Sequence, residues 1–195
     1  MNIAREIGGY KIGDVIGFLG QGFVSRFINL GTFGIPNWGV SHVAIVGEWE
    51  GIPILFESTT LNELPCYITG NFVKGVQAHP IAQRIGKYDG HVWHYPLYRE
   101  LYHHESTRLR RFLHDALGTP YDALGAVRSG GLITNFLEGR LRAEDLSSVF
   151  CSELMASAFG NLGLYSIANA SRWNPNKICR RLRRAGVLRK PVRKK

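Results

Sequence analysis

Residues 41–57 read Ser-His-Val-Ala-Ile-Val-Gly-Glu-Trp-Glu-Gly-Ile-Pro-Ile-Leu-Phe-Glu. The two ends of this stretch, 41–46 and 52–57, are short runs of mostly apolar and β-branched residues, which are typical of strands. The segment 48–51 between them ends in glycine and has the composition of a turn. The pattern predicts two antiparallel strands joined as a hairpin.

Two polar side chains, His42 and Glu57, are unusual in strands as apolar as these. If the turn leaves Gly47 opposite Ile52, His42 lies directly across from Glu57. Directly opposed residues share a face of the sheet, with Cβ atoms roughly 4.5 to 5.5 Å apart, so the carboxylate can accept from the imidazole. The pairing depends on the register, because a slip of one residue moves Glu57 to the other face. The alternative interpretation of Glu57 is a polar strand end.

Outside the hairpin, apolar periodicity and capping residues predict further strands and then helices. Strands followed by helices indicate an α+β fold rather than alternating α/β. The expected elements are strands over 13–18 and 91–97, a helix over 105–117 that Gly118 ends, a helix from about 151 to 161 capped by Ser147 or Ser148, and a short helix begun by Asn174 and Pro175.

Cys151 is expected at the start of its helix. Unpaired backbone N–H groups and the positive end of the helix dipole stabilise a thiolate at that position. Such a cysteine is a candidate nucleophile. The alternative is that Cys151 is the first residue of the apolar stripe of the helix, since free cysteine is often buried.

Cys151, His42 and Glu57 together suit nucleophilic catalysis. A thiol with a pKa of roughly 8.5 is mostly protonated at neutral pH, and a nearby imidazole can take its proton while a carboxylate fixes the histidine tautomer. Attack on an acyl carbon gives an oxyanion, for which the backbone N–H of Cys151 and the hydroxyl of Tyr121 are candidate donors. Ser41, next to His42, is a further candidate for substrate binding.

Five short motifs in the chain resemble a known pattern. They are Gly-Asp-Val-Ile at 13–16, Ser-His-Val-Ala-Ile-Val at 41–46, a Glu on the next strand, Pro-Tyr-Asp at 120–122, and Phe-Cys-Ser-Glu-Leu at 150–154. In this order they are similar to the permuted papain-like amidases, the YiiX/YaeF-like relatives of the NlpC-type cell-wall peptidases. The match spans about residues 13–178 and includes a proline near its end, Pro175.

The resemblance implies a circularly permuted papain-like fold, in which an antiparallel sheet packs against a helix that begins with the catalytic cysteine. It implies that Cys151 is the nucleophile, His42 the base and Glu57 its orienter, with Tyr121 near the oxyanion site and no cofactor. The expected substrate contains a peptide, amide or other acyl bond, which is cleaved through a thioester. The stretch between residues 122 and 151 is longer than the family pattern.

The resemblance extends more distantly to lecithin:retinol acyltransferase-like enzymes, so a lipid acyl hydrolase or acyltransferase is an alternative function. Those enzymes carry an Asn-Cys-Glu-His-Phe type of motif. Residues 150–154 do not reproduce it.

The net charge of +9 is concentrated at one end of the chain. From residue 154 onward there are eleven Lys or Arg and no Asp or Glu, whereas the first 153 residues carry 13 basic and 15 acidic residues. This asymmetry predicts a hydrolase domain over 1–176 and a basic C-terminal helix and tail over 177–195. Such a tail can bind nucleic acid, anionic lipid or another polyanion, or it can be a solvated arm. A non-catalytic protein that docks through the tail is therefore a second functional class.

The composition also predicts a cytoplasmic location. No apolar stretch approaches the ~18 residues of a membrane helix, and the first residues lack the apolar core of a secretory leader. The odd number of cysteines, without motif spacing, fits a reducing compartment. The three cysteines are Cys66, Cys151 and Cys179.

No metal site is predicted from the histidines. His91 and His94 lie three apart in an expected strand and so point to opposite faces, and no carboxylate cluster near His103 or His104 completes a metal shell. Asp14 and Asp122 are interpreted as turn or capping residues. A glycine-rich phosphate loop of the Walker or dinucleotide kind is absent from the sequence.

Overall fold

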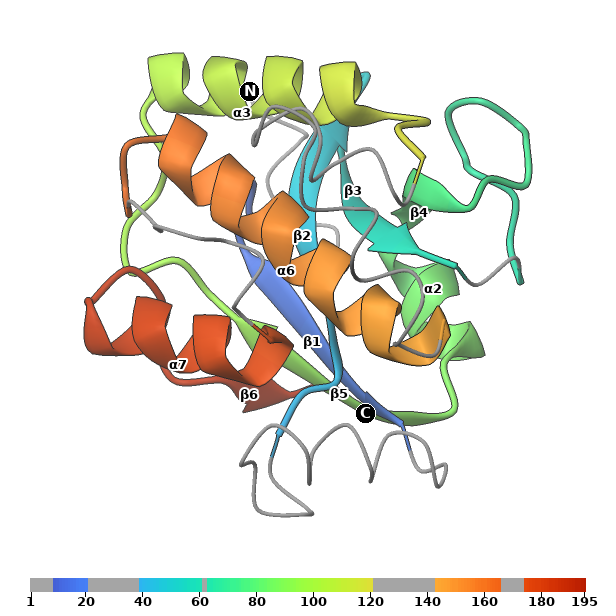
Figure 1. The fold of residues 1–195 in the computed structure, drawn as a ribbon. Helices are drawn as coiled ribbons and strands as arrows, with labels where there is room; N and C mark the ends of the chain where they lie inside the picture. The colour runs from blue at the N-terminus through green and yellow to red at the C-terminus, as the bar shows by residue number, and fades with distance from the viewer. Residues whose placement is uncertain (1–8, 21–38, 61–62, 121–142, 166–173) are drawn as a thin grey trace, which may run out of the picture.

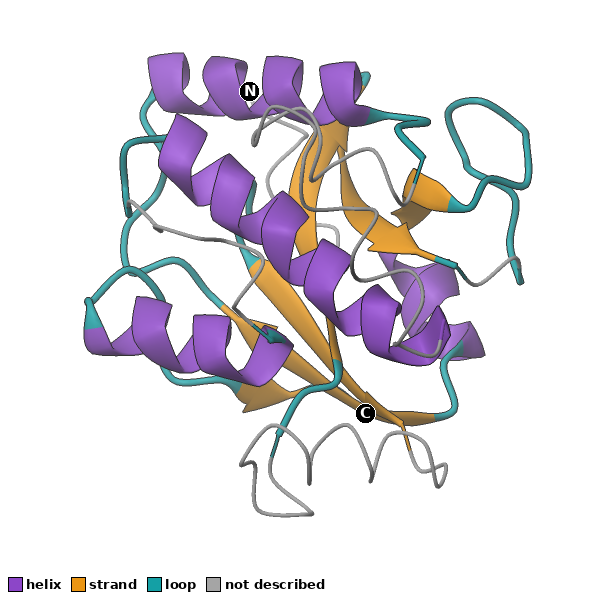
Figure 2. Cartoon of the chain, in the orientation of Figure 1, coloured by secondary structure: helices purple, strands orange, loops and turns teal. Residues whose placement is uncertain are grey.

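The computed structural model describes residues 9–20, 39–60, 63–120, 143–165 and 174–195. Within these ranges six strands form one antiparallel sheet in the order β4-β3-β2-β1-β5-β6, and four helices pack on it (Figures 1 and 2). This confirms the α+β prediction. The strands are β1 (Val15–Gly20), β2 (His42–Trp49), β3 (Ile52–Thr59), β4 (Gly75–Pro80), β5 (Gly90–Tyr95) and β6 (Val192–Arg193). The helices are α2 (Ile81–Lys87), α3 (His103–Ala116), α6 (Ala143–Asn161) and α7 (Pro175–Arg184).

The sheet has helices on both faces. Figure 1 shows α6 running diagonally across the front of the sheet, with α3 above it and α7 below it. The apolar residues of β2 and β3 alternate between the two faces, as the two-residue period of a strand requires. On the α6 side, residues such as Ile45 and Phe56 pack with Leu154 and Phe159. The smaller core on the α2 side consists of Ile16, Phe18, Ala44, Val46, Leu55, Ile81 and Val92.

The predicted hairpin is present, but the predicted register is wrong by two residues. The structure sets Gly47 opposite Ile54 rather than Ile52. The reason is the length of the turn, because only Glu50 and Gly51 separate the strands, with φ angles of 50° and 80°. Since side chains alternate with a period of two, a two-residue shift keeps His42 and Glu57 on the same face. Glu57 therefore lies diagonal to His42 instead of directly opposite.

The expected strand at 13–18 corresponds to β1, that at 91–97 to β5, and the helix at 105–117 to α3. Gly118 follows α3 with a φ of 73°, as expected for a residue that ends a helix. The predicted start of the cysteine-bearing helix is wrong, because α6 begins at Ala143. The sequence analysis also missed β4, α2 and β6.

The basic C-terminal residues belong to folded elements. Asn174 and Pro175 begin α7 as predicted, and the Asn174 side chain accepts a hydrogen bond from the Lys177 backbone N–H at 2.8 Å. The inward side of α7 is buried, whereas its arginines are exposed. Beyond it, β6 pairs with β5, and the Lys194 N–H donates to the carbonyl of Val92 at 2.8 Å. Val192 and Arg193 therefore form an exposed edge strand of the sheet, and the backbones of Lys194 and Lys195 bond to Val92 beyond it.

Among the helices that the structure describes, none combines the length and the apolar character that crossing a bilayer demands.

Candidate active site

Three residues that the sequence analysis selected come together at one end of β2. His42 is the first residue of β2, Glu57 lies in β3, and Cys151 lies in α6. Nε2 of His42 is 2.6 Å from Oε2 of Glu57, and the His42 side chain is also hydrogen-bonded to Cys151. Glu57 is fully buried, and Cys151 is 1% exposed. Because a carboxylate can only accept, Nε2 of His42 carries the hydrogen in its bond to Glu57.

The imidazole of His42 contacts residues from both hydrophobic cores, one on each face of the sheet. On the α2 side its ring centroid is 5.7 Å from that of Phe18, which is its pairing partner in β1. On the other side it meets Cys151, which belongs to the core between the sheet and α6. A position at the end of a strand, with 13% of the side chain exposed, allows both contacts.

The helix-start argument for Cys151 does not hold. Cys151 is the ninth residue of α6, two turns inside the helix. In a regular α-helix its N–H bonds to the carbonyl four residues earlier, so it is not available as an oxyanion donor. Ser147 and Ser148 have the residue type of caps, but the helix begins before them, at Ala143. The proximity of His42, rather than the helix dipole, distinguishes this thiol.

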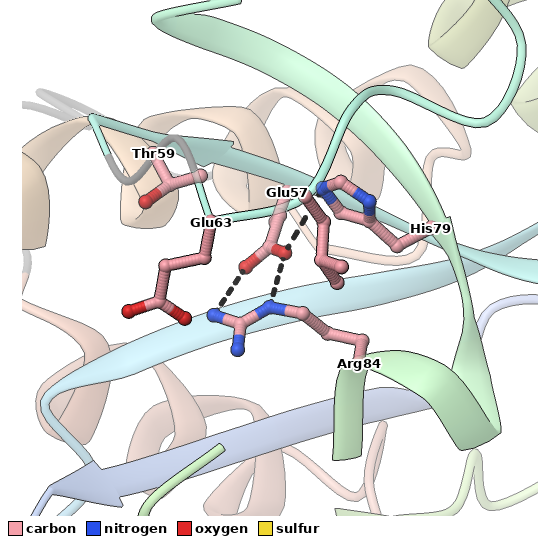
Figure 3. Close-up of a pocket in the computed structure, with 6 residues that line it drawn as sticks. Glu57, Thr59, Glu63, His79 and Arg84 are labelled. Carbon is pink, nitrogen blue, oxygen red and sulfur yellow. Dashed lines mark hydrogen bonds and ion pairs between the residues drawn. The ribbon is translucent and has the colours of Figure 1, made fainter. Parts of the chain in front are cut away.

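Arg84 is the site residue that the sequence analysis missed. Its Nε donates to Oε1 of Glu57 at 2.6 Å and its Nη2 donates to Oε2 at 3.2 Å, so the guanidinium binds both carboxylate oxygens (Figure 3). Arg84 comes from α2 and is only 4% exposed. A weak signal existed in the sequence, because Arg84 is spaced three residues from Ile81 and therefore lies on the inward side of a short helix.

His79 also approaches Glu57, but less closely. Its Nε2 is 3.7 Å from Oε1 of Glu57 and donates to the side-chain oxygen of Gln77 at 3.1 Å. Burial lowers the pKa of His79, Glu57 opposes that effect, and the positive charge of Arg84 lowers the pKa further. His79 is therefore neutral near pH 7.

Electrostatics keep Glu57 ionised and favour a charged imidazole. Burial alone raises the pKa of Glu57, but Arg84 and His42 hold it well below its usual range. Burial alone lowers the pKa of His42, but attraction and hydrogen bonds to Cys151 and Glu57 outweigh burial and raise the pKa to about 9. The lowered pKa of Glu57 and the raised pKa of His42 indicate a buried carboxylate and a buried imidazolium that stabilise each other.

Ser41 is next to His42, but its hydroxyl is already hydrogen-bonded to other residues. Its Oγ donates to the carbonyl of Phe18 at 3.2 Å, and it is also hydrogen-bonded to the side chain of Tyr88. The single hydroxyl hydrogen is thus directed at the backbone of β1 and is not free for an oxyanion. Tyr121, the other candidate, and the stretch after it up to residue 142 lie outside the described residues.

A small hollow, partly open to solvent, adjoins the carboxylate of Glu57. Figure 3 shows Glu63 and Thr59 near Arg84 at this hollow. Its lining residues are Glu57, Thr59, Glu63, Leu64, His79 and Arg84.

Within the described ranges, no group of three or more His, Cys, Asp or Glu side chains is arranged to hold a metal ion. The histidines of β5 are engaged separately. His94 bonds to Asp14 at 2.7 Å, and His91 is 2.7 Å from a guanidinium nitrogen of Arg193. Asp14 accepts from two backbone N–H groups, those of Lys11 and Leu97, which agrees with its interpretation as a turn residue.

Comparison with known proteins identifies the fold. No protein-family model matches the chain, and no curated protein matches it. Among solved structures, the metalloprotein YiiX from Escherichia coli O157:H7, described as DUF1105, matches with a TM-score of 0.53. The match covers 93% of this chain and 87% of YiiX, at 18% sequence identity. The chain therefore has a YiiX-like fold.

Proposed function

We propose that this protein is a cysteine hydrolase of the permuted papain-like kind, with Cys151 as nucleophile, His42 as base and Glu57 as orienter. The observation that carries the proposal is the double contact of one imidazole, with the Cys151 thiol and with the buried Glu57 carboxylate 2.6 Å away. Nucleophile, base and orienter within hydrogen-bond reach are the signature of an activated thiol. The order of His42 before Cys151 in the chain agrees with the permuted arrangement.

The reaction follows from these contacts. With Nε2 donating to Glu57, the other ring nitrogen of His42 takes the proton of Cys151 Sγ. The thiolate attacks the acyl carbon, the tetrahedral intermediate collapses, and His42 returns the proton to the leaving amine or alcohol. A water molecule, activated by His42, then attacks the thioester and releases the acid and the free thiol. Burial lowers the pKa of His42, but Cys151 and Glu57 raise it to about 9, which suits His42 to accept a proton in the first step.

Because Cys151 lies within α6, its backbone N–H is used by the helix. The hydrogen-bond donors to the oxyanion must therefore come from other residues. Tyr121 remains our proposed donor. The substrate is proposed to be a peptide, amide or ester, since all three acyl groups pass through the same tetrahedral geometry.

The printed title of the YiiX structure calls that protein a metalloprotein. The described residues of this site do not fit a metal, because the oxygens of Glu57 already accept from Arg84 and His42. The proposed mechanism therefore contains no metal-dependent step.

Thiol alkylation tests the proposal. At mildly acidic pH, iodoacetamide is expected to modify Cys151 well before Cys66 and Cys179, with peptide mass spectrometry giving each rate. Burial raises the pKa of Cys179, so it should react last. Burial opposes ionisation of Cys66 as well, but backbone N–H donors such as that of Ala78 lower its pKa, which makes it a demanding internal reference.

His42→Ala should slow alkylation of Cys151 at least tenfold and leave the rate of Cys66 unchanged. Equal, slow labelling of all three thiols in the wild-type protein, or no effect of His42→Ala, contradicts the proposal. A panel of matched peptide amides and short- and long-chain acyl esters then separates an amidase from a lipid acyl hydrolase or acyltransferase, by the thioester that accumulates on Cys151.

A second candidate function, docking on a polyanion, rests on the exposed arginines of α7 and the basic residues that follow it. Arg180→Glu combined with Arg184→Glu should reduce the salt concentration needed to elute the protein from heparin. Lys74→Glu, an exposed lysine before β4, is the matched control. Equal elution of both variants removes this candidate, whereas a shift without any thiol reactivity at Cys151 favours it over the hydrolase.

A further inference from the structure

We infer that Arg84 is a positioning residue for the proposed hydrolase, which fixes the plane and the charge of Glu57 so that Glu57 can orient His42. The inference rests on the proposed function and adds to it a residue from α2. Arg84 donates to Glu57, and Glu57 accepts from His42, so Arg84 acts on the imidazole through Glu57.

The two-point contact between Arg84 and Glu57 fixes the carboxylate. Nε reaches Oε1 at 2.6 Å and Nη2 reaches Oε2 at 3.2 Å, so the carboxylate cannot rotate without breaking one bond. Oε2 is the same atom that accepts from Nε2 of His42. The guanidinium therefore determines where the acceptor of the imidazole lies.

The charge of Arg84 matters because Glu57 has no exposed surface. An isolated carboxyl group in such a place takes up a proton, and an arginine remains charged at every pH of interest. His79 is a weaker source of charge, because its Nε2 lies 3.7 Å from Oε1 of Glu57, against 2.6 Å for Nε of Arg84, and burial lowers the pKa of His79. Without Arg84, Glu57 would be stabilised as an anion chiefly by His42 itself, whose own charge depends on Glu57.

Arg84 is itself held in place. Its guanidinium lies 4.8 Å from the ring centroid of Phe18 and 5.4 Å from that of Tyr88. Phe18 is also the ring that packs against His42. Guanidinium, phenyl ring and imidazole thus form one packed group, bridged by the carboxylate of Glu57, and its rigidity is what a positioning role requires.

The experiment compares the pH dependence of Cys151 alkylation in wild-type protein with that in Arg84→Met and Arg84→Lys. In Arg84→Met, Glu57 loses its buried cation and is expected to take up a proton. A neutral Glu57 no longer favours the imidazolium form of His42, so the midpoint of the pH dependence of Cys151 alkylation should move up by at least one pH unit. In Arg84→Lys a smaller upward shift is expected, since an ammonium keeps the charge but cannot bind both oxygens as a fork. The His42 resonances in NMR spectra should titrate at correspondingly lower pH.

A control exists next to α3, where the more exposed Arg99 also binds both carboxylate oxygens of one glutamate, Glu105, through Nη1 and Nη2 at 2.7 and 2.6 Å. Arg99→Met should leave the alkylation midpoint unchanged. Arg84→Met combined with Glu57→Gln removes both charges and should recover thermal stability lost in Arg84→Met, but should not recover the alkylation midpoint. A purely structural role predicts that stability and midpoint recover together.

The outcomes separate the two claims. If Glu57→Gln shifts the midpoint and Arg84→Met does not, the role of Arg84 is overturned and the proposed function stands. If neither His42→Ala nor Glu57→Gln affects Cys151, the proposed function itself fails. Should Arg84→Met not fold, Arg84→Lys decides, and a wild-type profile in that variant overturns the inference.

Discussion

One carboxylate oxygen, Oε2 of Glu57, accepts from both His42 and Arg84. Sequence reasoning found the first of these partners because a histidine and a glutamate stood out in apolar strands. It did not find the second, because α2 was not predicted and an arginine is exposed in most helices of this size. Buried charges are paired in folded proteins, and the burial of Glu57 that the structure shows is accordingly accompanied by a second cation, Arg84.

Glu57→Gln is expected to destabilise the protein by about 3–5 kcal/mol at pH 7, because it leaves Arg84 buried without its anion. The folded-state pKa of Glu57 lies below its unfolded value of 4.5. Its contribution is therefore complete above pH 4.5 and is lost as the pH falls toward the folded-state pKa. Urea unfolding of both proteins should give a smaller difference at pH 3 than at pH 7. A difference that is the same at both pH values contradicts this account of Glu57.

At the scale of elements, the β2–β3 hairpin separates what the sequence could predict from what it could not. Runs of apolar and β-branched residues were enough to predict both strands, and the two-residue period of a strand placed His42 and Glu57 on a shared face. The register was not predictable, because a two-residue turn and a four-residue turn leave the same faces buried. The start of α6 was mistaken for a similar reason, since Ser147 and Ser148 are good caps locally but the helix continues through them.

The turn of this hairpin gives a test of the observed register. Gly51→Ala places a side chain at a φ of 80° and should destabilise the protein by about 1 kcal/mol. Glu50→Asn, at a φ of 50°, should be neutral or stabilising, because asparagine tolerates this conformation. Denaturant unfolding measures both.

Gly86→Ala in α2 is the control for these turn variants. Gly86 has open space around its Cβ position and no positive φ, and so alanine should stabilise the protein by about 0.5–1 kcal/mol. If Gly51→Ala behaves like Gly86→Ala, the two-residue turn is wrong, and the register of β2 and β3 with it.

Across the entire chain, the charge asymmetry of the sequence predicted a basic C-terminal helix and tail, but it did not predict that residues 192–193 form a strand. A run of charges gives no apolar period, so β6 could not be recognised. Lys195 completes this edge, since its Nζ donates to the carbonyls of Gly86 and Tyr88 at 3.1 and 2.6 Å, at the end of α2. A cation at the C-terminal end of a helix is favourable.

Deleting residues 191–195 is expected to lower stability on the order of 1–2 kcal/mol, through lost hydrogen bonds to β5 and α2. Thermal unfolding measures the change, and Lys190→Ala, an exposed residue outside β6, is the control. A deletion without any effect on the melting temperature shows that this edge contributes nothing to the fold.

The two helix layers give the imidazole two independent surroundings. Cys151 reaches His42 from the α6 layer, whereas Arg84 fixes Glu57 from the α2 layer. Substitutions in the α6 layer can change the surroundings of the Cys151 thiol. Substitutions in the α2 layer can change the basicity of His42. For the proposed hydrolase, a library of variants confined to one layer should therefore change either the surroundings of the thiol or the basicity of His42, and not both together.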